Sequence, residues 1–260
     1  MTEAKSPGPQ VEKPRVSVVI PARNEAENLP SVLATVPEDI FEILLVDGAS
    51  TDATIAVAKR CRADVRVIKQ DGHGKGNALT CGFAAARGDI VVMLDADGSA
   101  DGGEIPHFVQ ALRDGVDLAK GSRFTGGGGS ADITLLRRVG NRTLCSLVNL
   151  LYRTRYTDLC YGYNAFWRRC LPKLCLDCDG FEIEALLNIR AARTGLAVRE
   201  VPSYEERRLH GESNLHVVRD GLRILRVILH ERLVSPRRLP PASEDVPLAL
   251  PSRLGKPTSW

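Results

Sequence analysis

The stretch Asp89-Ile-Val-Val-Met-Leu-Asp-Ala-Asp97 decides the fold and indicates where a site lies. The apolar residues from Ile90 to Leu94 do not alternate with polar ones, which is typical of a strand buried on both faces in a parallel sheet. Such sheets bind ligands beyond the carboxyl ends of their strands. Asp95 and Asp97 follow directly, and carboxylates there suit Mg2+ or Mn2+ that carries a substrate's phosphates. The alternative is a plain turn, because Asp and Gly98 favour turns.

The composition indicates one large α/β domain and excludes several classes of protein. The chain has 260 residues, of which 43% are hydrophobic, so it can bury a substantial core. The net charge of +3 is small and no zinc-finger or RNA-binding signature occurs, so we expect no nucleic acid partner. No apolar run approaches the ~20 residues of a membrane span, and the polar N-terminus does not resemble a signal peptide. We expect a cytoplasmic protein, either free or peripheral on the cytosolic face of a membrane.

The seven cysteines do not predict disulfides. Their number is odd and most of them lie inside apolar segments, which is typical of reduced cysteines that pack in a core. Cys175-Leu-Asp-Cys178 has the spacing of a redox or zinc pair. No second CxxC or His pair completes it, so we expect no metal there.

Alternating strands and helices predict a right-handed, mostly parallel sheet with helices on both faces. We expect a single domain at 15–233, between disordered Pro-bearing tails at 1–14 and 234–260. Asn24 is the predicted cap of the first helix. A flexible loop is expected at 126–129. The predicted strands are 15–20, 41–46, 64–68, 90–94, 116–120, 162–167 and 197–201, and the later helices are 134–152, 182–194 and 214–233.

Two familiar nucleotide-binding patterns fail on this chain. In Gly72-His-Gly-Lys-Gly-Asn77, a Rossmann fingerprint would need Gly at position 77, and a P-loop would need Ser or Thr after Lys75. Polar residues nevertheless follow five consecutive strands, whose carboxyl ends meet at one edge of a doubly wound sheet. This pattern predicts a phosphate- or nucleotide-binding edge, formed by Pro21 to Glu25, Asp47, Gly74 to Asn77, Asp95 with Asp97, and Gly121 to Arg123.

The ordered set of motifs resembles glycosyltransferase family 2, and within it the dolichyl- or polyprenyl-phosphate sugar synthases. The resemblance covers about residues 16–230. Gly211-Glu-Ser-Asn214, preceded by Arg207 and Arg208, resembles a segment of that branch. The other motifs are Val-Val-Ile-Pro-Ala-Arg-Asn-Glu25, Val-Asp-Gly-Ala-Ser-Thr-Asp-Ala-Thr54, Gly-Lys-Gly-Asn77, Leu-Asp-Ala-Asp97 and Gly-Ser-Arg123.

The resemblance implies a GT-A fold that binds a GDP- or UDP-sugar together with Mg2+ or Mn2+. Residues 15–123 would form the nucleotide-sugar-binding half and 124–233 the acceptor-binding half. Asp97 would be the main metal ligand, and Arg123 would face the donor phosphates or the acceptor. The implied nucleotide-sugar contacts are Pro21, Arg23 and Glu25 around the nucleotide, Asp47 at the base or ribose, Lys75 at the base or phosphates, and Asp95 with Ala96 in the D-x-D motif.

Two positions depart from the family pattern. Many members have two adjacent Asp after the second strand, and here the second is Gly48. Gly-Tyr-Asn164 stands where the lipid-phosphate branch usually has Gly-Phe-Arg. Contacts to the acceptor are therefore expected to differ from that branch.

The acceptor decides whether a general base is needed. A lipid phosphate has its second pKa near ~6, so it is mostly ionised at neutral pH and attacks unaided. A hydroxyl acceptor must lose a proton to a positioned carboxylate. Asp158, Glu182 and Glu184 are the candidates, although Glu182 and Glu184 cannot face one another within a helix. Acids at a helix start are also explained by the helix dipole alone.

The acceptor-binding half contains clustered arginines. Arg207, Arg208 and His210 are expected to bind an anionic acceptor together with Ser213, because Arg forks match phosphate geometry. A solvated charged loop is the alternative. The helices at 134–152 and 214–233 carry apolar residues beside many Arg, which suits either an anionic membrane surface or an ordinary core-facing helix.

The resemblance implies an inverting, metal-dependent glycosyltransferase that moves a sugar from a nucleotide-diphosphate sugar to a polyprenyl phosphate or another carrier. A hydroxyl acceptor, such as a glycolipid, a polysaccharide or a secondary metabolite, is the rival within the family. A sugar nucleotidyltransferase would show a Gly-rich basic loop after the first strand, which Pro21 to Asn24 do not form. A non-catalytic nucleotide-sugar-binding protein is disfavoured by the intact Asp95 and Asp97 pair.

Overall fold

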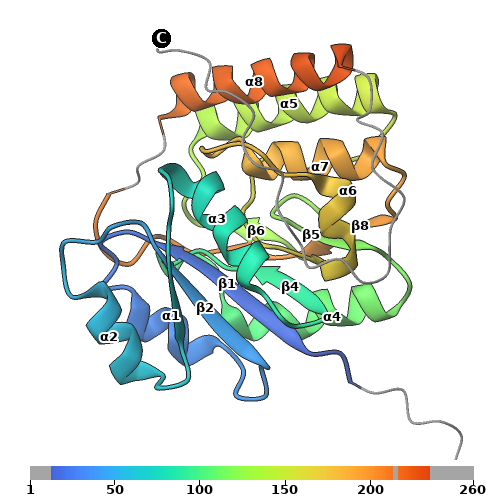
Figure 1. The fold of residues 1–260 in the computed structure, drawn as a ribbon. Coiled ribbons are helices and arrows are strands. Elements are labelled where there is room, and N and C mark those ends of the chain that lie inside the picture. The colour runs from blue at the N-terminus through green and yellow to red at the C-terminus, as the bar shows by residue number, and fades with distance from the viewer. Residues whose placement is uncertain (1–12, 213–215, 235–260) are drawn as a thin grey trace, which may run out of the picture.

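A seven-stranded sheet lies at the centre of the computed structural model, which describes residues 13–212 and 216–234 (Figure 1). Its strand order is β3-β2-β1-β4-β7-β5-β8. The strands are β1 (Val16–Ala22), β2 (Glu42–Asp47), β3 (Arg66–Lys69), β4 (Ile90–Met93), β5 (Leu118–Ser122), β7 (Asn164–Trp167) and β8 (Val198–Pro202). The prediction of a mostly parallel α/β sheet is confirmed, because only β7 runs antiparallel to its neighbours β4 and β5.

Helices cover both faces of the sheet, as the alternation of strands and helices predicted. They are α1 (Leu29–Thr35), α2 (Thr54–Cys61), α3 (Gly74–Ala85), η1 (Gly102–Glu104), α4 (Ile105–Arg113), α5 (Leu135–Tyr152), η2 (Arg168–Cys170), α6 (Leu171–Leu174), α7 (Ile183–Arg193) and α8 (Val217–Leu233). Side chains alternate along β1, so Val18 and Ile20 pack with α1, α2 and α4, while Val19 packs with α3 and α7.

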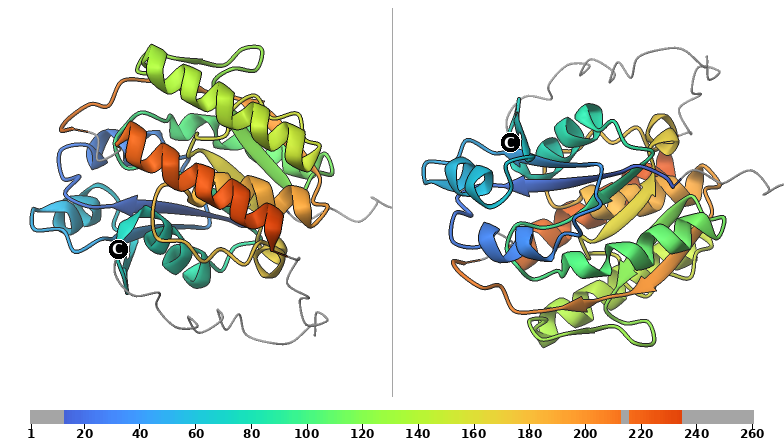
Figure 2. Two further views of the ribbon diagram at one scale, coloured as in Figure 1. Left: turned by 90° about the horizontal axis from the view of Figure 1, so that it is seen from above. Right: turned by 90° about the horizontal axis from the view of Figure 1, so that it is seen from below.

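Helices α5 and α8 form a further layer outside α7. Cys145 and Val148 of α5 and Ile224 and Ile228 of α8 share a third apolar cluster with Ile189 of α7. Figures 1 and 2 show α5 and α8 side by side on the outside of the molecule, away from the sheet. The last helix of the described residues therefore packs mainly on α7 and α5.

Several predicted boundaries need correction. Asn24 does not cap the first helix, which begins at Leu29; it has φ 57° and its side chain accepts from the Thr51 N–H at 2.8 Å. Asn tolerates this left-handed conformation better than most residues. The fifth strand begins at Leu118 instead of 116. The predicted loop at 126–129 runs into β6 (Gly129–Ser130), which pairs with β9 (Tyr204–Glu205).

Some predictions fall on residues that the structure does not describe. The final helix was predicted from Asn214, but it begins at Val217, and 213–215 lie outside the described residues. The predicted disordered tails also lie outside, apart from 13, 14 and 234. Their disorder stays a prediction.

Gly82 is expected to be essential for the contact between α3 and the sheet. A Cβ there would lie 2.3 Å from Val19 Cγ1 and 2.9 Å from Val46 Cγ2. Gly82→Ala should therefore lower the free energy of unfolding by about 1–3 kcal/mol, measured by urea denaturation. Gly140→Ala in α5 is the matched control, because nothing lies within 4 Å of its Cβ position. The control should be neutral or stabilising, and equal destabilisation of both variants would contradict the packing argument.

Candidate active site

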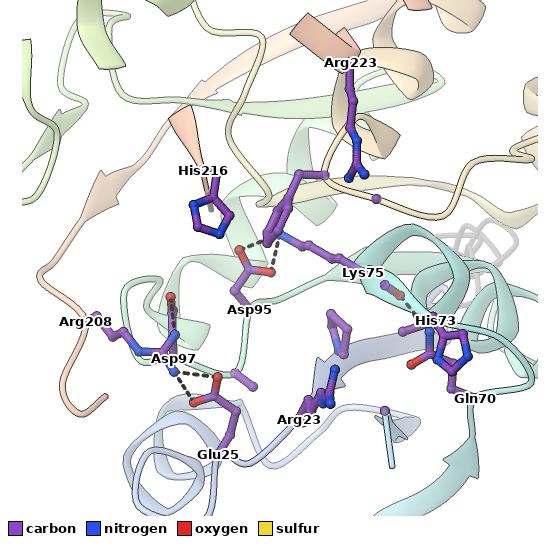
Figure 3. Close-up of a pocket in the computed structure, with 18 of the residues that line it drawn as sticks. Arg23, Glu25, Gln70, His73, Lys75, Asp95, Asp97, Arg208, His216 and Arg223 are labelled. Atoms are coloured by element: carbon purple, nitrogen blue, oxygen red, sulfur yellow. Dashed lines mark hydrogen bonds and ion pairs between the residues drawn. The ribbon is translucent and has the colours of Figure 1, made fainter. Parts of the chain in front are cut away.

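The carboxyl ends of β1, β2, β3 and β4 open into one pocket of about 440 Å3 (Figure 3). This is the edge of the sheet that the polar strand ends predicted. The second half of the chain closes the pocket with residues from the α7 start and from α8. Its lining is Pro21 to Arg23, Glu25, Gly48, Gln70, His73 to Lys75, Ala78, Asp95 to Asp97, Gly180, Phe181, Arg208, His216, Arg219 and Arg223.

Lys75 connects the two halves of the chain at the floor of the pocket. Its ammonium lies 2.7 Å from Asp95 Oδ1 and 2.6 Å from Glu184 Oε1. Burial alone would lower the pKa of Lys75, but the charges of Asp95 and Glu184 outweigh it and raise that pKa above its ordinary value. Burial also raises the pKa of Glu184, although Lys75 opposes the shift. The ammonium is therefore a permanently charged group beside the D-x-D motif.

The glycines that flank Lys75 do not form a phosphate cradle. The Gly76 N–H donates to the Asp179 carbonyl at 2.9 Å, and the same oxygen lies 3.5 Å from the Asn77 nitrogen. These amides at the start of α3 are thus occupied by the segment that leads into α7. Lys75 contributes its charge, and the glycines allow the close approach of that segment.

Asp97 lies at the opposite side of the D-x-D motif and faces a different cation. Its Oδ1 accepts from the Ser99 N–H at 3.0 Å, and its Oδ2 lies 3.4 Å from Arg208 Nη1. Arg208 also donates from Nη2 to both oxygens of Glu25, at 2.6 and 2.8 Å (Figure 3). Its Nε donates to the His210 carbonyl at 2.6 Å, so Arg208 is held between Glu25 and Asp97. Glu25, Asp97 and Arg208 therefore meet at the pocket, whereas the sequence placed Arg208 only at the acceptor.

The donor set at the D-x-D motif fits a divalent metal that arrives with a diphosphate. Asp95 and Asp97 both line the pocket, and the His216 imidazole lines it as well. Within residues 13–212 and 216–234 there is no ready group of three or more metal-binding side chains. Mg2+ usually takes one or two carboxylates and completes its shell with phosphate oxygens and water. Two carboxylates without a full protein cage match that requirement.

Arg123 and Asp158 lie outside the lining of this pocket. Arg123 Nε and Nη2 donate to the two oxygens of Asp158 at 2.7 and 2.9 Å, and Nη1 donates to Glu205 at 3.0 Å. Burial would raise the pKa of Asp158, but Arg123 lowers it below its ordinary value. A buried carboxylate with a lowered pKa and both oxygens bound is a poor general base. The structure therefore gives no support to Asp158 as the base.

Several of the remaining predicted site residues do not line the pocket. Asp47 is buried and accepts from the Ser50 N–H, so Gly48 lines the pocket in its place. Arg207 donates to the Ala131 carbonyl at 3.2 Å, and the His210 N–H donates to Asn28 Oδ1 at 2.9 Å. Neither side chain lines the pocket. Ser213 lies outside the described residues.

The sequence interpretation missed several residues that line the pocket. His216, Arg219 and Arg223 come from the start of α8 and Phe181 from the segment before α7, while Gln70 and His73 follow β3. Arg219 and Arg223 are four residues apart on a helix, which was a usable signal. Glu182, a candidate base, accepts a hydrogen bond from the Gly180 N–H at 3.2 Å and does not line the pocket.

The cysteines are less buried than the sequence predicted. All seven are free thiols in the described part of the chain, and only Cys145 and Cys170 are buried, while Cys61 is exposed.

A mostly parallel sheet with a D-x-D motif at the end of β4 defines the GT-A class of nucleotide-sugar-dependent transferases. The sequence model of "Glycosyl transferase family 2" matches residues 17–174. Glycosyltransferase AglJ of Haloferax volcanii is 32% identical over 209 residues, which is 79% of this chain and 68% of that protein. AglD of the same organism is 33% identical over 232 residues, 81% of this chain and 36% of that protein. The chain belongs to glycosyltransferase family 2 and is a glycosyltransferase.

A solved structure agrees with the fold and with the use of a metal. Glucosyl-3-phosphoglycerate synthase from Mycobacterium tuberculosis was crystallised with Mn2+, UDP-glucose and glycerol 3-phosphate. It is 25% identical with a TM-score of 0.68, and the match covers 84% of this chain and 80% of that chain. A divalent metal cofactor is therefore consistent with both the family and the pocket.

Lys75→Met should destabilise the protein in a pH-dependent way. The variant leaves Glu184 buried without its cation, so the pKa of Glu184 should rise further above its unfolded-state value. Stability is then lost as the pH rises, because only the unfolded chain ionises freely. We expect a loss of about 3–5 kcal/mol in urea unfolding at pH 8 and a smaller loss at pH 5.

The double variant Lys75→Met/Glu184→Gln is the control for this measurement. Removing the uncompensated carboxylate should restore most of the stability at pH 8. A loss that is the same at both pH values, and that the second substitution does not relieve, would exclude the buried charge as its cause.

Proposed function

We propose that the enzyme transfers a sugar with inversion from a nucleotide-diphosphate sugar to a polyprenyl (dolichyl-type) phosphate or a related carrier. The observation that carries the proposal is that the carboxylates lining the pocket are all paired with cationic side chains. Among the described residues that line it, Asp95 is bound to Lys75, and Glu25 and Asp97 are bound to Arg208. A carboxylate that holds a cation is poorly suited to take a proton, so an acceptor that is already ionised fits best.

The donor side rests on the two cationic contacts of the D-x-D motif. Asp97 and Asp95 would hold Mg2+ or Mn2+, which supplies positive charge to the leaving diphosphate. Lys75 stays charged and lies at Asp95, where it would add to that neutralisation. Pro21, Arg23 and Glu25 border the same pocket and would contact the nucleotide. The donor would be a UDP- or a GDP-sugar.

The acceptor side rests on arginines beyond the metal site. Arg208, Arg219 and Arg223 line the pocket from the second half of the chain. A donor diphosphate and an acceptor phosphate together carry more negative charge than one metal ion offsets. Arg forks suit phosphate groups, so these side chains would hold the acceptor phosphate near the donor. A lipid-linked acceptor places the reaction at a membrane surface.

A hydroxyl acceptor is the second candidate. The relative from Mycobacterium tuberculosis was crystallised with glycerol 3-phosphate, which carries hydroxyl groups as well as a phosphate. In this chain Glu184 would then be the base, because burial raises its pKa and it lies 2.6 Å from Lys75. The observed ion pair with Lys75 would have to open first, and for this reason we rank it second.

Asp97→Ala should abolish transfer and metal-dependent donor binding while the fold is retained. Without Asp97 the diphosphate loses its metal-bound charge, so activity should fall at least about 100-fold, the size of effect typical of a lost charge-stabilising group. Mn2+-dependent binding of UDP- or GDP-sugars is measured by calorimetry. Asp101→Asn is the matched control, since Asp101 is exposed and caps η1 outside the pocket. Full activity in Asp97→Ala would refute the site.

A panel of donors and acceptors tests the substrate class. Wild-type enzyme is offered UDP- and GDP-sugars with polyprenyl phosphate, and separately with hydroxyl acceptors such as glycerol 3-phosphate and glycolipids. We expect a glycosylated polyprenyl phosphate, detected by mass spectrometry, and no product with the hydroxyl acceptors. Product from a hydroxyl acceptor alone would overturn the preferred acceptor and leave the transferase assignment intact.

A further inference from the structure

Apolar side chains gather on the outside of α5 and α8. Twelve large hydrophobic residues are exposed in the described part of the chain, and eight of them belong to these two helices. Leu150 is 78% exposed and Leu233 is 85% exposed, so they contribute little to the core. The eight residues are Leu135, Leu136, Val139 and Leu150 of α5 and Val218, Leu222, Leu229 and Leu233 of α8.

The exposed apolar residues form a stripe on each helix opposite its buried side. On α8 the stripe follows the spacing 218, 222, 229 and 233, while the buried positions are 220, 224, 228 and 231. On α5 the stripe is 135, 139 and 150, and the buried positions are 141, 145 and 148. Helical periodicity of 3.6 residues separates these sets onto opposite sides. Each helix therefore has one apolar side for the core and a second one for a partner.

The charges around the two stripes are all positive. α5 contains no Asp or Glu. The two acids of α8, Asp220 and Glu231, are buried and paired with arginines. The exposed charged residues of the two helices are Arg138, Arg142, Arg219, Arg223, Arg226 and Arg232. Apolar stripes flanked by arginines suit a surface that is anionic outside and apolar beneath.

We propose that the outward side of α5 and α8, the α5–α8 face, docks on an anionic lipid bilayer. This inference rests on the proposed function, because a lipid-linked acceptor requires the enzyme to reach a membrane. Within residues 13–212 and 216–234, every helix is too short or too polar to span a bilayer. The contact is therefore peripheral, with apolar side chains in the headgroup region and arginines at the lipid phosphates.

The positive charge of the α5–α8 face favours a bilayer over two other candidate partners, a second copy of the chain and the segment 235–260. A second copy of the chain would bring two arginine-rich faces together with no exposed acid on either to pair with them. Residues 235–260 contain four basic and two acidic residues, so this segment does not complement the face either. An anionic bilayer provides both negative charge and apolar volume.

The position of α8 gives the contact a functional meaning. Arg219 and Arg223, in its first half, line the pocket, while Leu222 between them belongs to the exposed stripe. The mouth of the pocket thus lies beside the α5–α8 face. A phosphate at the level of the lipid headgroups would reach these arginines while its chain stays in the bilayer.

Vesicle co-sedimentation of the full chain tests this proposal. Wild-type protein should bind vesicles of phosphatidylcholine with 30 mol% phosphatidylglycerol and bind pure phosphatidylcholine weakly. Leu150→Glu/Leu229→Glu removes apolar contacts, and Arg142→Glu/Arg226→Glu reverses two charges away from the pocket. Each double variant should weaken partitioning at least about 20-fold, since each arginine near such a surface contributes roughly fivefold. Phe41→Glu and Arg60→Glu, exposed elsewhere, are the matched controls and should bind as wild type.

Transfer to a short-chain, water-soluble polyprenyl phosphate without vesicles separates this proposal from the proposed function. The double variants should keep wild-type activity there. If the wild-type protein does not bind anionic vesicles, the proposed membrane docking is wrong, whatever the result of the transfer assay. Binding that depends only on residues 235–260, or a dimer in size-exclusion chromatography that the leucine variants dissociate, would also overturn it. If the wild-type enzyme does not glycosylate the water-soluble polyprenyl phosphate, the proposed acceptor is wrong, and the vesicle-binding result still stands.

Discussion

The ion pairs of Lys75 are the constraint on which the rest of the site depends. Lys75 belongs to the first turn of α3, Asp95 follows β4, and Glu184 lies in the first turn of α7. Glu184 is buried, Lys75 is largely so and Asp95 is partly exposed. The three charges are stable together only if each has its partner, because an unpaired charge inside the protein is strongly destabilising. The contact therefore fixes how the second half of the chain sits against the first, and it holds the D-x-D motif at the junction.

Local patterns explain what could be predicted from the sequence. The apolar run from Ile90 to Leu94 predicted a buried strand of a parallel sheet. The polar residues after each early strand predicted the edge of the sheet where the pocket lies, including the carboxylates Asp95 and Asp97. The insertion of antiparallel β7 between β4 and β5 was not predictable, because strand order depends on contacts distant in sequence. Lys75 and Glu184 are 109 residues apart, and no periodicity connects them. Asp158 was misread for the same reason: its partner Arg123 gives it a structural environment that the sequence does not display.

Helix α8 combines two tasks that are usually divided between elements. Its buried side packs on α7, its first half reaches the pocket, and its outer side carries an apolar stripe among arginines. This arrangement needs no separate anchor in the described residues to bring a site near a lipid. It also explains why so many arginines occur in a chain whose net charge is only +3. The positive charge is concentrated where phosphates are expected, and acids elsewhere balance it.

The approach of the segment 178–180 to α3 limits how the protein can be recombined. Gly74 has φ 85°, and a Cβ at Gly74 would lie 2.1 Å from the Asp179 carbonyl, while one at Gly76 would lie 2.5 Å from the Cys178 carbonyl. The two segments fit only as a matched pair, although about one hundred residues separate them. A chimera that takes its first half from one family member and its second half from another must inherit both segments from the same parent. The unit that can be exchanged between family members is therefore a set of segments in contact in the fold, not a continuous stretch of chain.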